Sequence, residues 1–442
     1  AGNIISQSGT TITLGASGDT IALASGASQS GFGRTGTVDW QTTVKTTGFT
    51  AVNGEGYFCN TAGGAFTLTL PSSPSVGNIV GLKDYNGNFA TANLTIGRGG
   101  SPINGGTAAD VVVTTAGASI FLVYVDASQG WVATQDDSST FAGESFITAT
   151  GGTITTCGDD KIHTFTGPGT FTVCSVASCA PNNAVAYMVV AGGAGGGDSS
   201  GNSSNGGGGA GGFREGTTAP IVPYTASPLV AATGITVTAT GYPITVGAGG
   251  PRGAGNSPDN TGGTGGVSTF STITSAGGGG GGAHSPGVPA NGATGGSGGG
   301  GGASPAGSGG AGNTPPTSPA QGTAGSAASN CAPGWGGGGG GGATVAGGAS
   351  SPTVGGPGGN GATTSISASP TTYGGGGGGA ITNSGEPDAG TGGSGGGGRG
   401  AYPSTPAVAG TINTGGGGGG AVNQNSSAAG GSGIVIIRYK FQ

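Results

Sequence analysis

Seven runs of consecutive glycines restrict the possible folds of this chain more than any other feature. Each run is four to seven residues long, and they begin at Gly206, Gly277, Gly298, Gly336, Gly374, Gly395 and Gly415. The segments between them are rich in Ser, Thr, Pro and Asn and differ widely in length. Because a flexible linker has no reason to keep a common run length, we interpret the runs as structural rods joined by variable loops.

The conformation that suits such a rod is the polyglycine II helix. This extended three-fold helix rises about 3.1 Å per residue without internal hydrogen bonds, so its N–H and C=O groups point sideways. Neighbouring helices can satisfy these groups, and only glycine lacks the Cβ atom that would hold the backbones apart. The runs therefore predict packed polyglycine II helices with loops at the ends of the lattice. The alternative is a disordered Gly/Ser spacer.

Charge and hydrophobicity exclude several classes of protein. Glycine is 114 of 442 residues and charged residues are only 6%, so the chain lacks the high charge that accompanies most disorder. Ten basic residues against sixteen acidic ones leave no basic stripe for phosphates, and we expect no nucleic-acid partner. No stretch of about twenty apolar residues is present, so we expect no membrane insertion.

The apolar patterns around the glycine-rich segment predict four domains. Strands at 185–190 and 434–437 enclose that segment, and we expect them to pair and close a domain at 185–442. Alternation at Phe66, Leu68 and Leu70 and an Asn-Gly turn at Asn86 predict an antiparallel β-sandwich or jelly roll at 37–136. Residues 137–184 predict a β-hairpin connector with a Gly-Pro-Gly turn at 167–169.

The N-terminal segment, residues 1–36, contains a nine-residue near-repeat. Ile12 and Leu14 correspond to Ile21 and Leu23. Because strands this short cannot bury a face alone, we expect the repeats to be intertwined with neighbouring chains; an ordinary edge hairpin is the alternative. The predicted fold is thus mainly β: an elongated fibre with short intertwined β-repeats, a β-sandwich-like domain and a C-terminal glycine-rich domain of packed polyglycine II helices.

Few side chains in the loops between the runs carry recognition chemistry. Aromatic and Arg side chains are the most effective at binding sugars and protein epitopes. On this basis the candidate receptor-binding residues are His284, Trp335, Tyr373, Arg399 and Tyr402. The structural alternative for each is that it plugs an end of the lattice.

No catalytic or metal-binding pattern is present, so we predict no enzyme, no cofactor and no metal. The four lysines do not follow a glycine run as a phosphate-binding loop requires. We interpret the acidic pairs Asp136, Asp137 and Asp159, Asp160 as solvated turns rather than a calcium site. The cysteines lack zinc-ligand spacing. Cys174 with Cys179, Cys157 with either of them, or free thiols remain open.

Several motifs occur in a distinctive order between about 163 and 440: HTFTGPGTFTV, YMVVAGGAGGG, GGGGAGGFREG, ITVGAGG, STFSTITSAGGGGGG and SGIVIIRYK. This order resembles the glycine-rich tail-fibre and adhesin proteins of tailed bacteriophages. The resemblance implies an extracellular, homotrimeric fibre in the virion tail that contacts other tail proteins. Its tip would bind a host outer-surface receptor, either a protein or a glycan.

Two other functions are compatible with the sequence. A secreted bacterial surface filament or matrix protein would use the glycine lattice for assembly rather than for recognition. Carbohydrate recognition would instead belong to the β domain at 37–135.

Overall fold

The computed structural model describes residues 38–105, 110–135, 146–177, 179–198, 203–218, 224–255, 260–284, 290–303, 305–329, 335–382, 388–422 and 426–441. The chain divides into two compact units, Ala1–Gly143 and Glu144–Gln442. The predicted repeats at 1–36 lie outside the described residues. The described residues form 23 β-strands and one short 3-10 helix, Ala180–Asn183, and none of their helices has the length and hydrophobicity needed to cross a bilayer.

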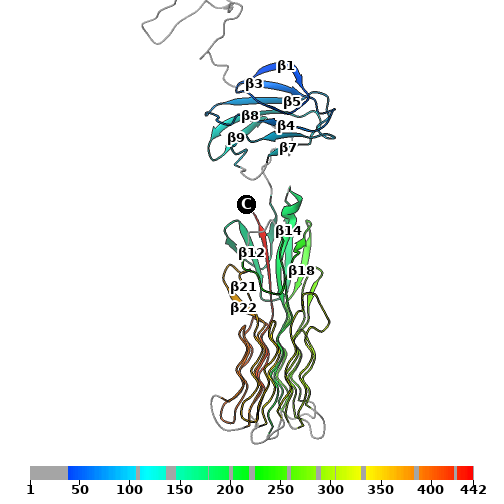
Figure 1. Cartoon of the computed structure of the whole chain (residues 1–442), viewed down its shortest axis with the longest axis vertical. Helices are drawn as coiled ribbons and strands as arrows, with labels where there is room; N and C mark the ends of the chain where they lie inside the picture. Colours follow the sequence, from blue (N-terminus) through cyan, green and yellow to red (C-terminus); the bar gives the residue numbers. More distant parts are fainter. Residues whose placement is uncertain are drawn as a thin grey trace, which may run out of the picture. The chain divides into compact units, whose positions relative to one another are not determined.

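The first unit is a sandwich of two β-sheets (Figure 1). The five-stranded sheet has the order β1 (Asp39–Lys45), β3 (Glu55–Cys59), β5 (Ile79–Asp84), β8 (Ser119–Asp126), β9 (Gly130–Gln135). The four-stranded sheet has the order β2 (Phe49–Thr50), β4 (Phe66–Thr69), β6 (Leu94–Gly97), β7 (Val111–Val113). Leu68, Leu82, Leu122 and Trp131 belong to the core between them.

The predicted antiparallel arrangement of this unit is wrong for four strand pairs. β1–β3, β3–β5, β2–β4 and β4–β6 are parallel, because the chain alternates between the two sheets from β1 to β6. The Asn-Gly turn at Asn86 therefore connects strands of different sheets and forms no hairpin. The carboxylate of Asp84 organises this connection by accepting hydrogen bonds from the N–H groups of Gly87, Phe89 and Gly117.

The second unit contains three sheets beside its glycine runs. The largest has the order β11 (Thr153–Cys157), β12 (Asp160–Phe165), β23 (Ile434–Lys440), β14 (Ala184–Val190), β15 (Phe213–Gly216), β16 (Val230–Ala231), and β17 (Ile235–Thr236) also pairs with β14. A five-stranded sheet has the order β10 (Thr148–Thr150), β13 (Gly169–Ser175), β18 (Gly241–Thr245), β19 (Ser268–Phe270), β20 (Ile273–Ser275). β21 (Ala362–Thr364) and β22 (Thr371–Tyr373) form a separate hairpin.

The predicted pairing of the two enclosing strands is confirmed. β14 and β23 are antiparallel neighbours, with Val190 opposite Ile434 and Ala186 opposite Arg438. The segment predicted as a separate connector is instead built into the second unit, since β12 pairs with β23 and β13 pairs with β18. The Gly-Pro-Gly turn therefore joins strands of two different sheets. Cys59, Cys157, Cys174 and Cys179 are free thiols, and Cys331 lies outside the described residues.

Both faces of the largest sheet are buried because β14 and β23 are apolar at nearly every position. One face packs Tyr187 and Tyr439 against Phe171 and Phe270 of the five-stranded sheet. The other face packs Met188 and its neighbours against residues that include Phe213, Ile366 and Tyr373. The β21–β22 hairpin thereby covers the second face.

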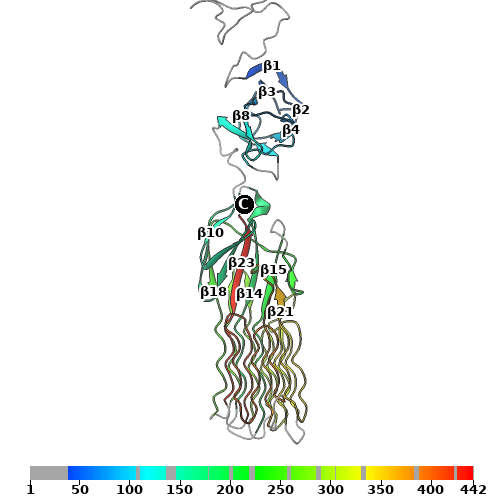
Figure 2. The ribbon, with the colours of Figure 1, turned by 90° about the vertical axis from the view of Figure 1, so that its left-hand side faces the viewer.

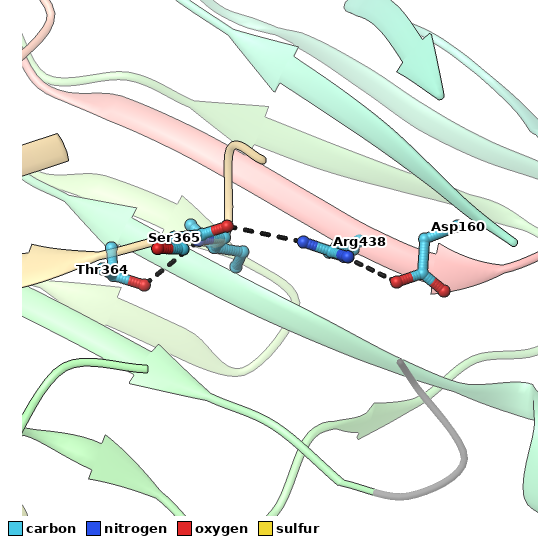
Figure 3. Close-up of polar contacts among 5 residues, drawn as sticks. Asp160, Thr364, Ser365 and Arg438 are labelled. Atoms are coloured by element: carbon cyan, nitrogen blue, oxygen red, sulfur yellow. Dashed lines mark hydrogen bonds and ion pairs between the residues drawn. The ribbon is translucent and has the colours of Figure 1, made fainter. Parts of the chain in front are cut away.

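A buried ion pair lies at the end of this second core (Figure 3). Arg438 Nε is 2.7 Å from Asp160 Oδ2, and the side chains are 4% and 0% exposed. Arg438 Nη1 also donates to the carbonyl of Ser365, while Thr364 Oγ1 donates to Glu215 Oε1 at 2.6 Å. The predicted solvated turn is therefore wrong for Asp160, whose carboxylate compensates the buried guanidinium.

The glycine runs lie side by side as extended traces between the sheets and a set of turns at the opposite end of this unit (Figures 1 and 2). We call that end the loop end. The described parts of the segments on either side of these turns end at 198, 255, 284, 303, 329, 382 and 422 and resume at 203, 260, 290, 305, 335, 388 and 426, and the turn 402–405 is described throughout. The described residues of these segments are neither helix nor ladder-forming strand.

Hydrogen bonds between the segments repeat every third residue. In the segment 203–212, every third N–H group donates to the same neighbouring segment, so the donors fall into three sets with one neighbour each. The pairs are Gly206–Gly282, Gly209–Gly279 and Gly212–Ala276; Gly207–Gly338 and Ala210–Gly341; Gly208–Gly418 and Gly211–Gly415. The carbonyls of the same segment accept from three further segments, through the N–H groups of Gly197, Gly300 and Gly377. This segment thus has six hydrogen-bonded neighbours.

Whether a segment lies in the interior or at the periphery depends on how its non-glycine residues are spaced along the sequence. Uninterrupted runs such as the one that begins at Gly374 are buried, whereas segments at the periphery expose a non-glycine residue at every third position. Examples of such exposed triplets are Pro305, Ser308, Ala311 and Val354, Pro357, Asn360. A peripheral segment therefore directs its Cβ atoms outward and its glycines inward.

Candidate functional site

The loop end gathers most of the candidate side chains. His284 lies at the end of one described segment there, and Trp335 lies at the start of another. Tyr402 begins the turn 402–405, and the side chain of Arg399 extends across this turn to the carbonyl of Pro406. Several loops between these segments fall outside the described residues. The described part alone brings one imidazole, one indole, one phenol and one guanidinium to the same end of the unit.

Tyr373 lies elsewhere. It is the last residue of β22, pairs with Ala362, and is only 5% exposed. Its ring belongs to the core cluster that includes Ala343 and Ile366. This placement corresponds to the structural alternative rather than to a surface contact, and we leave Tyr373 out of the candidate surface.

Arg399 and Tyr402 form one cluster. The guanidinium lies 4.8 Å from the centre of the Tyr402 ring, which is a cation–π distance. Nη1 donates to the carbonyl of Gly400 and Nη2 to that of Pro406. The Tyr402 ring is buried against Ile381 and Ala389. The buried ring of Tyr402 therefore supports the half-exposed side chain of Arg399.

His284 is positioned by a residue that the sequence did not single out. Its backbone N–H donates to Asn205 Oδ1 at 2.9 Å, and its side chain is half-buried. Asn205 is fully buried, and its Nδ2 donates to the carbonyl of Ala421. The Asn205 carbonyl also accepts from the N–H of Ala380. One side chain and its peptide thus join three segments where they reach the loop end.

Asp198 plays a corresponding part on the other side of the 199–202 loop. It is 5% exposed, and Oδ2 accepts hydrogen bonds from the N–H and Oγ of Ser427 at 3.2 Å. Its own N–H donates to the carbonyl of Asn260. The sequence signal for both residues was available, because Asp198 directly follows the glycine triplet that begins at Gly195 and Asn205 directly precedes the run at Gly206. Sequence reasoning missed them because it searched for exposed aromatic and basic residues.

Trp335 has an uncommon backbone conformation. Its φ is +41°, a region that bulky residues rarely adopt and that costs about 1–3 kcal/mol. The side chain is half-buried. Because such strain persists mainly where the surroundings impose it, Trp335 is a candidate for a ligand contact.

Within the described residues no group of three His, Cys, Asp or Glu side chains is placed to hold a metal. The other histidine, His163, lies in the sheet core, where its Nδ1 contacts the carbonyl of Gly151 and its Nε2 contacts the hydroxyl of Tyr439. Burial lowers the pKa of His163, so it is kept neutral for packing.

Residues 164–440 match the model of a family described as a glycine-rich domain. A search of curated proteins finds no match.

Proposed function

The chain belongs to the glycine-rich domain family, and from this premise we propose that it is a bacteriophage tail-fibre adhesin. In this proposal its loop end binds a protein or glycan receptor on the host surface. The chain acts in the virion tail as a homotrimer together with other tail proteins. It is not an enzyme.

The observation that carries the proposal is the convergence of His284, Trp335, Arg399 and Tyr402 at one end of the unit. Asn205 and Asp198 fix the ends of the segments that bear or adjoin them. Side chains on segments whose ends are held by buried hydrogen bonds lose less entropy on binding than side chains on free loops. A rigid support with variable loops is the usual form of a recognition surface.

We further propose that the support is a lattice of polyglycine II helices. The three-residue repeat of the hydrogen bonds and the six neighbours of segment 203–212 support this proposal, because that helix has three residues per turn and no internal bonds. The lattice also bears on the filament alternative. Peripheral positions such as Ser308 and Pro357 carry outward Cβ atoms, which would keep the backbone of another chain from adding to the lattice.

The test is binding of the full chain to envelopes of the bacterium that particles carrying this chain infect. The wild-type chain is expected to bind and to compete with the particles for cells. Trp335→Ala with Arg399→Ala should weaken binding at least about tenfold, a value of about 1.4 kcal/mol that is usual for recognition side chains. Arg98→Ala, which removes an arginine from the first unit, is the matched control. The proposal fails if the wild-type chain neither binds nor competes.

A further inference from the structure

The outer face of the five-stranded sheet in the first unit is apolar. Ile120 and Leu122 of β8 point into the core, so the alternate residues Phe121, Val123 and Val125 point outward. Phe121 is joined on this outer face by half-buried side chains from the neighbouring strands: Trp40, Phe58, Ile79 and Val132. Ring centres are 4.9 Å apart for Trp40 and Phe58 and 5.9 Å apart for Trp40 and Phe121.

The opposite sheet of the same unit provides an internal comparison. Leu68, Leu94 and Ile96 point into the core, so its outer face carries Thr67, Thr69 and Thr95. A β-sandwich in water normally shows such polar outer faces. The aromatic outer face of the five-stranded sheet therefore has the character of a surface that is covered in the assembled protein.

The low charge of this outer face indicates what kind of surface covers it. Among the described residues on this face, Lys83 is the charged side chain, and its Nζ already donates to the carbonyl of Gly117. A face made mainly of rings and branched aliphatic side chains, with few polar groups, fits another apolar protein surface, whereas a glycan would need several hydrogen-bonding side chains beside the rings.

The segment that leads into β1 indicates which protein covers this face. Val38 lies on the same face, where its Cγ2 occupies the space above Gly56 and Gly81 that a Cβ at either glycine would need. Thirty-seven residues precede it, including the repeats with Ile12, Leu14, Ile21 and Leu23. Repeats that wind around neighbouring chains would deliver this face to those chains.

We propose that the outer face of the five-stranded sheet, with Trp40, Phe58 and Phe121 at its centre, is the surface through which copies of this chain associate. Aromatic residues at the centre and few charges are the composition of interface cores. The proposal concerns the first unit and is independent of receptor binding at the loop end.

Two exposed valines provide a matched test. Val125, 43% exposed, lies on the apolar face, and Val112, 44% exposed, lies on the threonine-lined face of the other sheet. Sedimentation of the full chain over a range of concentrations should show an oligomer. Val125→Glu should weaken association about a hundredfold, because an unpaired carboxylate would be buried between copies. Val112→Glu should behave as wild type.

Trp40→Gln provides a second variant at the centre of the face, and circular dichroism verifies that each variant is folded. The proposal is overturned if the wild-type chain is monomeric at every concentration. It is also overturned if folded Val125→Glu and Trp40→Gln associate as the wild-type chain does, in which case residues 1–37 of the same chain or another ligand cover the face. A wild-type chain that associates but does not bind cells would count against the proposed function alone.

Discussion

The close packing of the glycine backbones makes Gly377→Ala a strong test of the fold. Gly377 lies in the uninterrupted run that begins at Gly374, and its N–H donates to the carbonyl of Gly208 at 2.8 Å. A Cβ atom at Gly377 would lie 2.1 Å from the carbonyl oxygen of Gly418. Contacts below 3.0 Å essentially never occur for a Cβ atom, so a backbone would have to move by at least 3.0 − 2.1 = 0.9 Å.

The magnitude follows from what that movement disturbs. It opens the bond from Gly377 to Gly208 and the 2.8 Å bond from Gly208 to Gly418, and each buried group left without a partner costs about 1–3 kcal/mol. Overpacking adds about 1–3 kcal/mol, and the stiffer unfolded chain returns about 0.4–1 kcal/mol. The free energy of unfolding should fall by about 3 kcal/mol or more, which lowers the Tm of the second unit by roughly 6–12 °C.

The matched control is Gly255→Ala. Gly255 lies in a peripheral segment, and the nearest atom to a Cβ there is Asp198 Oδ1 at 3.6 Å, an ordinary contact. Its Tm should stay within about 2 °C of wild type or rise slightly, because only the unfolded chain is affected. Calorimetry of the full chain measures both variants. Equal Tm values for Gly377→Ala and Gly255→Ala would refute the close packing of the runs.

Three further predictions concern the second unit. Residue-resolved amide exchange should show slow exchange throughout Gly206–Gly212, since every N–H there is bonded to another segment; uniformly fast exchange would mean a tether. The pKa of His163 is lowered by burial, so the unfolded state binds the proton first, and stability should be constant above about pH 7 and fall as the pH drops below about 6.5 with a slope of at most about 1.4 kcal/mol per pH unit. Calorimetry of His163→Gln across this range should show the slope removed, and an unchanged slope would assign it to other groups. Arg438→Met should lower the free energy of unfolding in urea by about 3–5 kcal/mol, because Asp160 is left charged and buried, and Asp160→Asn in the same chain should restore part of the loss; a change below about 1 kcal/mol would contradict a compensating ion pair.

Sequence reasoning worked where a pattern alone determines the outcome. The strands β14 and β23 are apolar at nearly every position, and such strands need neighbours on both faces, so their pairing could be foreseen. The strand order of the first unit could not. A period of two tells which side chains of β3 and β5 face inward, but it does not tell whether successive strands pair with each other or alternate between sheets.

The candidate site was predictable in part. Residue type selected His284, Trp335, Arg399 and Tyr402, which lie at the loop end, but residue type also selected Tyr373, which does not. The direction of the chain distinguishes them: Tyr373 ends a strand from which the chain leaves the sheets, whereas Trp335 begins a segment that returns to them. Counting the reversals from β14 onward would have placed each residue at its end of the unit.

A core made from backbone changes which positions can vary. In an ordinary domain, loop ends are held by side chains that also fill the core, so altering a loop endangers packing. Here the segments are joined to one another mainly by N–H and C=O groups, and at the loop end side chains such as those of Asn205 and Asp198 add further bonds. Substitutions at the loop end that spare these two residues should leave the backbone hydrogen bonds between the segments unchanged, whereas interior positions such as Gly377 accept no Cβ atom. The loop end can therefore change in sequence, whereas the interior glycines are fixed by geometry.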